Sequence, residues 1–358
     1  MRKSLNSEKE IKKFDKGNIL GSVRSLPDQI EQAWTEVKDL DIPKACALVD
    51  NVVICGMGGS ALGGRIVDSL IVDRIRVPIE VVTEYDIPNY VGPKSLVILT
   101  SYSGNTEETV SAAHKAFVKK AEIFGITTGG KLAEFLKKEK IPAYIYESKE
   151  NPSNQPRLGL GYSVAATMAI LAKCGFITFA EEDIKSALAN LRKFSEEFDS
   201  DVPENKNLAK RMAIKLKGKI PILVTSEHLV GATHAFKNLL NEGAKTFSAS
   251  FDLPELNHHL MEGLRNPAMA KEYLHFLFFE SKLYSPGIRK RYPITQEVVE
   301  KNEIDYSVYQ LRSGKKIQQV FEILIFASFV QFYLAFIYGV DPLKIPWVDY
   351  FKEKLAKG

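Results

Sequence analysis

The sequence predicts an α/β protein made of two similar units, each a mainly parallel sheet flanked by helices. Three observations lead to this prediction. The chain has 358 residues, which exceeds the usual size of one domain. In its first half, short β-rich runs alternate with helical patterns. The same rhythm restarts after a charged, helix-rich stretch, so we place the boundary near residue 200, giving units at 1–200 and 201–358.

Composition and charge indicate an ordinary folded protein. The chain is 45% hydrophobic and 26% charged, and its formal net charge of +4 is small for its length. We therefore expect no nucleic-acid partner. The three cysteines are widely spaced without a Cys-x-x-Cys pair, and the polar opening MRKSLNSEKE has no signal-peptide pattern. These features predict a protein of the reducing cytoplasm.

One apolar stretch, residues 321–338, approaches the length of a membrane span. It contains Glu322 near one end and Gln331 inside it, and its Phe and Ala residues recur at helical spacing. We interpret it as a helix buried between units or subunits, and we expect no membrane association.

The order of elements follows from these patterns. Residues 1–50 read as a helical extension. In the first unit, NVVIC, VPIEVVTEY, SLVILT, EIFGITT and AYIYES are expected strands, with helices after GMGGS and SYSGNT. In the second unit, KIPILVTSE is an expected strand, HLVGATHAFKNLLNEGAK a helix, TFSASFDLPELNHH a strand and loop, and YLHFLFFES a strand or helix start, followed by a long helix and a polar tail.

The segment SYSGNTEET, residues 101–109, carries the strongest functional signal. Three hydroxyls, from Ser101, Ser103 and Thr106, surround Gly104 directly after an expected strand. The helix that begins near Thr106 points its free N–H groups at the same place, which suits a phosphate. The alternative is that these residues only cap the helix. Capping needs one hydroxyl, so the pattern favours phosphate binding.

The glycine-rich turn GMGGSALGG, residues 56–64, has two interpretations. Gly56, Gly58 and Ala61 match the G-x-G-x-x-A dinucleotide fingerprint, and Glu80 lies on the next strand, where a ribose-binding acid is expected. Alternatively, Ser60 donates to the same phosphate as the second turn, because neighbouring strand-to-helix turns open on one crevice. Neither turn ends in the G-K-[ST] of a Walker motif, which argues against kinases and NTPases.

Three further segments carry candidate chemistry. Arg157 lies between two loop-forming stretches in NPSNQPRLGLGYS, where a fixed guanidinium can stabilise charge on a substrate oxygen; a solvated surface arginine is the alternative. Glu242 lies near the end of an amphipathic helix in NEGAK, where a solvated surface glutamate is the alternative to a catalytic one. In PELNHH, His258 or His259 is a candidate acid or base. Adjacent histidines point apart in an extended chain and no Cys or His cluster accompanies them, so no metal site is expected.

Taken together, GMGGSALGG, SYSGNTEET, PSNQPRLGLGYS, NEGAK, ELNHH and the terminal GVDPLKIPWVDYFKEKL resemble the bifunctional phosphoglucose/phosphomannose isomerases. This branch of the phosphoglucose isomerase superfamily has two tandem sugar-isomerase (SIS) domains with flavodoxin-like sheets. The family usually has Glu-Asn-Ala-Lys at 242–245 and Asn-His-Asn at 257–259, where this chain has Gly243 and His259. The glycine is expected to loosen the helix, and His259 to compete with His258.

The resemblance implies a role for each matching residue. Glu242 is the base that moves a proton between C2 and C1 of the sugar, and Arg157 stabilises the enediolate oxygens. His258, reaching in from the partner subunit of a homodimer, opens the sugar ring together with Lys352, for which Lys354 is the alternative. The substrate phosphate is held by Gly59, Ser60, Ser101, Ser103 and Thr106.

The expected function is therefore interconversion of glucose 6-phosphate, and by resemblance mannose 6-phosphate, with fructose 6-phosphate, without metal or cofactor. The alternatives are a non-catalytic sugar-phosphate-binding SIS protein and a nicotinamide-dependent dehydrogenase. A DNA-binding regulator is disfavoured, because the short polar N-terminus leaves little room for a helix-turn-helix. An amidotransferase is disfavoured too, because it needs an N-terminal glutaminase with a nucleophilic cysteine and this chain begins MRKSLNSE.

Overall fold

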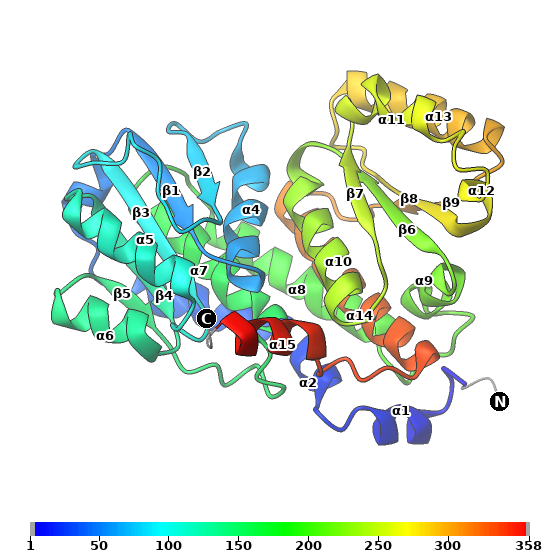
Figure 1. The fold of residues 1–358 in the computed structure, drawn as a ribbon, viewed down its shortest axis with the longest axis horizontal. Coiled ribbons are helices and arrows are strands. Elements are labelled where there is room, and N and C mark those ends of the chain that lie inside the picture. The colour runs from blue at the N-terminus through cyan, green and yellow to red at the C-terminus, as the bar shows by residue number, and fades with distance from the viewer. Residues whose placement is uncertain (1–3, 356–358) are drawn as a thin grey trace.

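A five-stranded parallel sheet forms the centre of the first half (Figure 1). The structure is a computed structural model that describes residues 4–355. The strand order is β2-β1-β3-β4-β5, the order of flavodoxin-like doubly wound sheets, which confirms the predicted fold class. The strands are β1 (Asn51–Cys55), β2 (Ile79–Val82), β3 (Ser95–Ser101), β4 (Glu122–Thr127) and β5 (Ala143–Ile145).

Helices cover both faces of this sheet because its strands are apolar on both sides. Alternate residues of β1 point to opposite faces, so Val53 and Cys55 pack with α5 and α6, whereas Val52 and Ile54 belong to the core shared with α4 and α7. The helices of this half are α1 (Glu8–Phe14), α2 (Ile19–Arg24), α3 (Leu26–Lys38), α4 (Gly59–Ile71), α5 (Glu107–Val118), α6 (Gly130–Lys138), α7 (Leu160–Lys173) and α8 (Glu181–Phe198).

The second half repeats the pattern with four parallel strands in the order β7-β6-β8-β9. The strands are β6 (Ile220–Thr225), β7 (Ala249–Asp252), β8 (Leu274–Glu280) and β9 (Asp305–Gln310). The helices are α9 (Leu208–Leu216), α10 (Val230–Glu242), α11 (Leu260–Gly263), α12 (Ala270–Tyr273), α13 (Pro286–Lys301), α14 (Lys316–Tyr338) and α15 (Pro346–Leu355). The sequence analysis did not foresee β9. Its segment DYSVYQ is short and polar, and only two of its six residues are buried.

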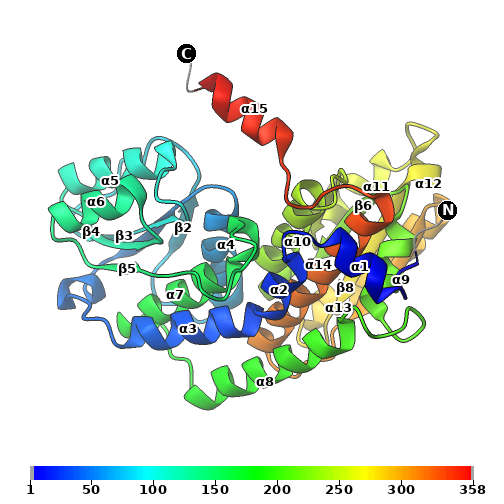
Figure 2. The same cartoon turned by 90° about the horizontal axis from the view of Figure 1, so that it is seen from below.

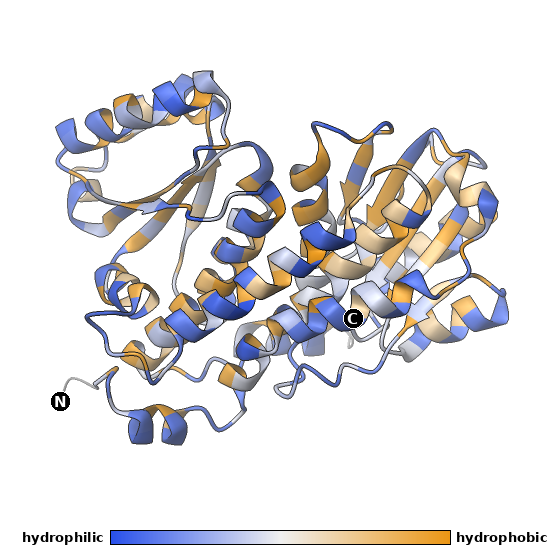
Figure 3. Ribbon diagram, turned by 180° about the vertical axis from the view of Figure 1, so that it is seen from behind, coloured by the Kyte–Doolittle hydropathy of each residue, from blue (hydrophilic) through white to orange (hydrophobic). Residues whose placement is uncertain are grey.

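A layer of helices lies between the two sheets. Helix α14 packs against α8, α9 and α10, and α10 also packs against α4 of the first half. By length and composition α14 is able to cross a membrane, yet most of it is buried inside the protein. Figure 3 shows hydrophobic residues concentrated on the strands and central helices and hydrophilic ones on the outer helices. The apolar run at 321–338 is therefore a core helix.

Residue 200 lies in the connection between α8 and α9. Helices of both halves pack together on either side of this connection, so contacts extend continuously across it. The division into 1–200 and 201–358 stays a prediction.

Candidate active site

Two strand-to-helix junctions of the first half meet at one edge of the sheet. Strand β1 pairs in parallel with β3, with Cys55 opposite Leu99, so the turns that follow both strands leave the sheet side by side. The hydroxyl Oγ of Ser60, in the first turn of α4, accepts a hydrogen bond of 3.0 Å from the backbone N–H of Tyr102 in the second turn. The glycine-rich and hydroxyl-rich turns therefore form one structure at the point where the strand order reverses, which is where doubly wound sheets bind ligands.

The hydroxyl-rich turn is held by its own side chains. Thr106 is the N-cap residue of α5, but its side chain makes no capping hydrogen bond to the helix. Its Oγ1 lies 2.9 Å from Oγ of Ser101, which also accepts from the N–H of Gly104 at 3.1 Å. Ser101 is completely buried, whereas Ser103 is exposed and Thr106 half-buried. The capping interpretation therefore does not account for the hydroxyl of Thr106.

Each turn contains a glycine with little room for a side chain, and the hydroxyl-rich turn requires its glycine. Gly104 has φ +69°, and a Cβ there would lie 1.7 Å from the carbonyl oxygen of Gly129. At Gly59 a Cβ would lie 3.3 Å from backbone atoms of Pro156 and Arg157. The loop that carries the candidate arginine thus packs directly on the glycine-rich turn.

Arg157 lies in a short 3-10 helix, Pro156–Leu158, and its side chain is 4% exposed. Four acceptors surround its guanidinium, two at each terminal nitrogen: Nη1 donates to Oε1 of Gln155 at 3.0 Å and Oε1 of Glu242 at 3.0 Å, and Nη2 to the carbonyls of Pro342 at 2.6 Å and Leu343 at 3.0 Å. Burial lowers the pKa of Arg157, and the charge of Glu242 opposes this effect. An arginine held this way is a fixed positive charge.

Glu242 is the last residue of α10, and its side chain is 33% exposed. Its ion pair with Arg157 joins the two halves of the chain, so the structure brings these two predicted residues together. The ammonium of Lys245 donates to the backbone carbonyl of Glu242 at 2.6 Å. Burial and the neighbouring charge of Arg157 lower the pKa of Lys245. The sequence analysis missed Gln155 and Lys245, although both lie within motifs that it had singled out.

His258 lies at the other end of the second half. Helix α10 runs back from the carboxyl end of β6 to the amino end of β7, so Glu242, its last residue, lies at the amino ends of these parallel strands. His258 follows the carboxyl end of β7, in the 3-10 helix Glu255–His258. The 13 residues of α10 span about 20 Å, which separates the two ends. His258 and His259 are both exposed. Within one chain the fold does not place His258 beside Glu242.

Lys352 belongs to α15, every residue of which is exposed. Figure 2 shows this helix standing away from the rest of the protein. The segment just before it reaches the site, because the carbonyls of Pro342 and Leu343 accept hydrogen bonds from Arg157. Within residues 4–355, no hydrogen bond or ion pair is seen for the Lys352 ammonium, and Lys354 lies over the ring of Tyr350 at 5.5 Å.

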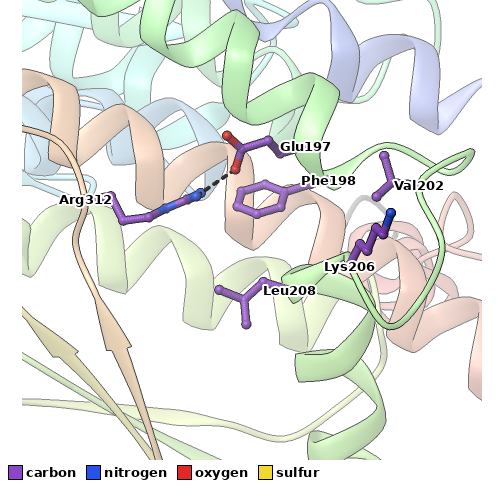
Figure 4. Close-up of a pocket in the computed structure, with 6 residues that line it drawn as sticks. All are labelled: Glu197, Phe198, Val202, Lys206, Leu208 and Arg312. Atoms are coloured by element: carbon purple, nitrogen blue, oxygen red, sulfur yellow. Dashed lines mark hydrogen bonds and ion pairs between the residues drawn. The ribbon is translucent and has the colours of Figure 1, made fainter.

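A pocket away from this site lies beside the connection between α8 and α9 (Figure 4). Its lining includes Arg312, whose guanidinium is 2.7 Å from a carboxylate oxygen of Glu197 and lies over the ring of Phe194 at 4.4 Å. The guanidinium is thus already paired with Glu197 and stacked on Phe194, and we assign this pocket no role. In the part of the chain that the structure describes, no three His, Cys, Asp or Glu residues gather as metal ligands do.

The two sheets, with the glycine-rich and hydroxyl-rich turns joined at the strand reversal, define the class of protein, a pair of tandem SIS domains. A family model described as the bacterial phospho-glucose isomerase C-terminal SIS domain matches residues 205–355. A crystal structure of a hypothetical protein from Thermus thermophilus, 18% identical in sequence, superposes with a TM-score of 0.76 over 98% of this chain and 94% of that chain, which supports the fold.

Two curated relatives cover most of the chain. A bifunctional phosphoglucose/phosphomannose isomerase of Caldicellulosiruptor bescii is 34% identical over 94% of this chain and 98% of the relative. One of Thermoplasma acidophilum is 32% identical over 86% of this chain and 90% of the relative. The chain belongs to the bifunctional phosphoglucose/phosphomannose isomerase family.

Proposed function

We propose that this protein is an isomerase that interconverts glucose 6-phosphate and mannose 6-phosphate with fructose 6-phosphate through a cis-enediol(ate). The printed names of its relatives support this activity. The observation that carries the proposal is the 3.0 Å contact between Arg157 and Glu242, which sets a carboxylate against a buried cation beside the two turns.

The phosphate of the substrate binds at the crevice between the two turns. Ser60, Ser103 and Thr106, with the N–H groups at the start of α5 and at Gly59, form a cluster of donors suited to a dianion. Ser101 shapes this cluster, because its hydroxyl holds both Thr106 and the N–H of Gly104. Binding the distant phosphate supplies energy that orients C1 and C2 against the base.

Proton transfer then needs a base and a cation at the developing oxyanion. Glu242 removes the proton from the carbon next to the carbonyl and returns it to the neighbouring carbon. Arg157 faces the enediolate oxygens with a guanidinium already fixed by Gln155 and two carbonyls, so little reorganisation accompanies the reaction. Glucose and mannose 6-phosphates differ only at C2, and both give the same planar enediol, so one site serves both.

A coupled assay on the two aldose phosphates, run with a chelator, tests the activity. Glu242→Gln is expected to lower kcat by several orders of magnitude while fructose 6-phosphate still binds. Glu297→Gln is a matched control, because Glu297 is paired with Lys301 on the exposed face of α13. Absence of turnover in the wild-type protein, or unchanged turnover in Glu242→Gln, would refute the proposal.

We also propose that the active protein is a homodimer whose sites are shared between subunits. Two observations support this: His258 and Glu242 lie at opposite ends of the second half, and α15 exposes a row of apolar side chains. Trp347 is 82% exposed and Phe351 63%, and with Tyr350 they recur at helical spacing on one helix. A second copy that covers α15 and supplies His258 accounts for both features.

Mixing two inactive variants tests the shared site. If His258 acts across the interface, a Glu242→Gln subunit and a His258→Ala subunit together form one intact site. Random exchange then restores about a quarter of wild-type activity, because half of the dimers are mixed and each holds one intact site. No recovery, with subunit exchange verified by sedimentation or native mass spectrometry, would contradict sharing.

The two alternatives have less support. A dinucleotide site of this kind needs an acidic side chain that is free to bind the ribose. Glu80 accepts a hydrogen bond from Tyr90 instead. Saturable NADH binding would restore the dehydrogenase. A non-catalytic sugar-phosphate binder has no need of Glu242.

We also propose a cytoplasmic location, since all three cysteines are free and buried. Cell fractionation tests this location.

A further inference from the structure

Gly243, the residue directly after Glu242, has its side-chain space filled from another helix. A Cβ built at Gly243 would lie 1.4 Å from Oε1 of Gln331 and 2.5 Å from its Cδ. Gly243 has φ −88° and ψ −49°, which any residue adopts, so the structure requires glycine here for space and not for its backbone freedom. The sequence analysis expected Gly243 to loosen the helix; instead, the residue is buried and packed.

Gln331 is an unusual residue for its position. It lies inside α14, the most apolar helix of the protein, and is 1% exposed. Its amide nitrogen is buried without a hydrogen-bond partner among the described residues. An apolar side chain of similar length would avoid this cost. The feature that distinguishes Gln331 from such a side chain is its planar carboxamide, whose oxygen is seated on Gly243.

We propose that Gln331 is a positioning residue for Glu242, acting through Gly243. Helix ends are the least constrained part of a helix, and Glu242 is the final residue of α10. The amide of Gln331 rests on Gly243 from the buried middle of α14 and fixes the turn that aims the carboxylate at Arg157. This inference rests on the proposed role of Glu242 as the base.

A double-mutant cycle tests it. Gly243→Ala introduces a Cβ into occupied space, and we expect kcat to fall at least about tenfold, because small displacements of a catalytic group are costly. Gln331→Ala removes the support, and kcat falls about threefold or more. In the double variant the alanine at 243 fits the vacated space, so Gly243→Ala has little further effect. The Michaelis constant for fructose 6-phosphate stays within about twofold throughout, because the phosphate turns are untouched.

Two more variants separate positioning from stability. Gln331→Met keeps the volume and removes the unpaired amide, so we expect an unchanged or higher melting temperature with a lower kcat. Gln319→Ala is the matched control, because Gln319 is equally buried in α14 but bonds to His228 and Ser281 in the second half. It is expected to lower the melting temperature and leave kcat unchanged.

The outcomes distinguish this inference from the proposed function. The inference would be overturned if Gly243→Ala and Gln331→Ala affected kcat independently, or if Gln331→Met kept full kcat. Activity of the wild-type protein would still uphold the isomerase in either case. If Gly243→Ala does not fold, Gln331→Met and Gln319→Ala still decide the matter. A wild-type protein inactive on all three sugar phosphates removes both proposals together.

Discussion

Replacing Arg157 by lysine tests how the buried cation works. The substitution keeps the positive charge and removes the planar fork that donates to four acceptors. A lysine ammonium has three donors on a narrower head, so it leaves at least one of the carbonyls of Pro342 and Leu343, the amide oxygen of Gln155 or the carboxylate of Glu242 without its partner.

The expected size follows from this accounting. A buried acceptor left unpaired costs about 1–3 kcal/mol of unfolding free energy. Catalysis suffers more than the charge alone implies, because the ammonium is not fixed where the enediolate forms. Loss of one well-placed donor at such an oxygen typically lowers kcat by about 10²–10³-fold. We therefore expect Arg157→Lys to lower kcat about 10²-fold.

The coupled isomerase assay measures kcat and the Michaelis constant, and thermal unfolding measures stability on the same preparation. Arg24→Lys is a matched control, since Arg24 forms an exposed pair with Asp199 away from the two turns. Full kcat in Arg157→Lys would refute the reasoning, because it would show that charge suffices and the fork geometry does not matter.

Two further predictions concern binding and acid stability. The double substitution Ser103→Ala with Thr106→Ala is expected to raise the Michaelis constant about 10²-fold or more, because each lost hydrogen bond to a charged oxygen costs about 1.5–3 kcal/mol. Ser111→Ala, on the same α5, is the control. An unchanged Michaelis constant in the double variant would place the phosphate elsewhere. Burial lowers the pKa of His275 from 6.5 to about 4. As the pH falls from 6.5 to 4, the His275 imidazole stays neutral in the folded protein but gains a proton in the unfolded chain. The free energy of unfolding therefore falls by up to about 1.4 kcal/mol per pH unit over this range. His275→Gln should make the decline measured by urea unfolding shallower, and an equally steep decline would contradict this.

Local patterns in the sequence determined most of the fold. A strand of a parallel sheet is buried on both faces and reads as a continuous apolar run, and a helix buried on one face shows a period of 3.6, so NVVIC, SLVILT and the helices that follow were predictable. The hydroxyl and glycine turns were predictable too, because a residue type at a strand-to-helix junction limits both backbone conformation and chemistry. Strand β9 escaped this reasoning, since a short, half-exposed edge strand carries little hydrophobic pattern.

Tertiary structure decided which distant residues meet. Nothing local in NPSNQPRLG or NEGAK specifies the contact between Arg157 and Glu242, which depends on how α10 and α14 pack against the first half. The seating of Gln331 on Gly243 is likewise a matter of three-dimensional space, because residues 88 positions apart fill one volume only after both helices have packed. Sequence periodicity reports what a segment buries; only packing determines what it is buried against.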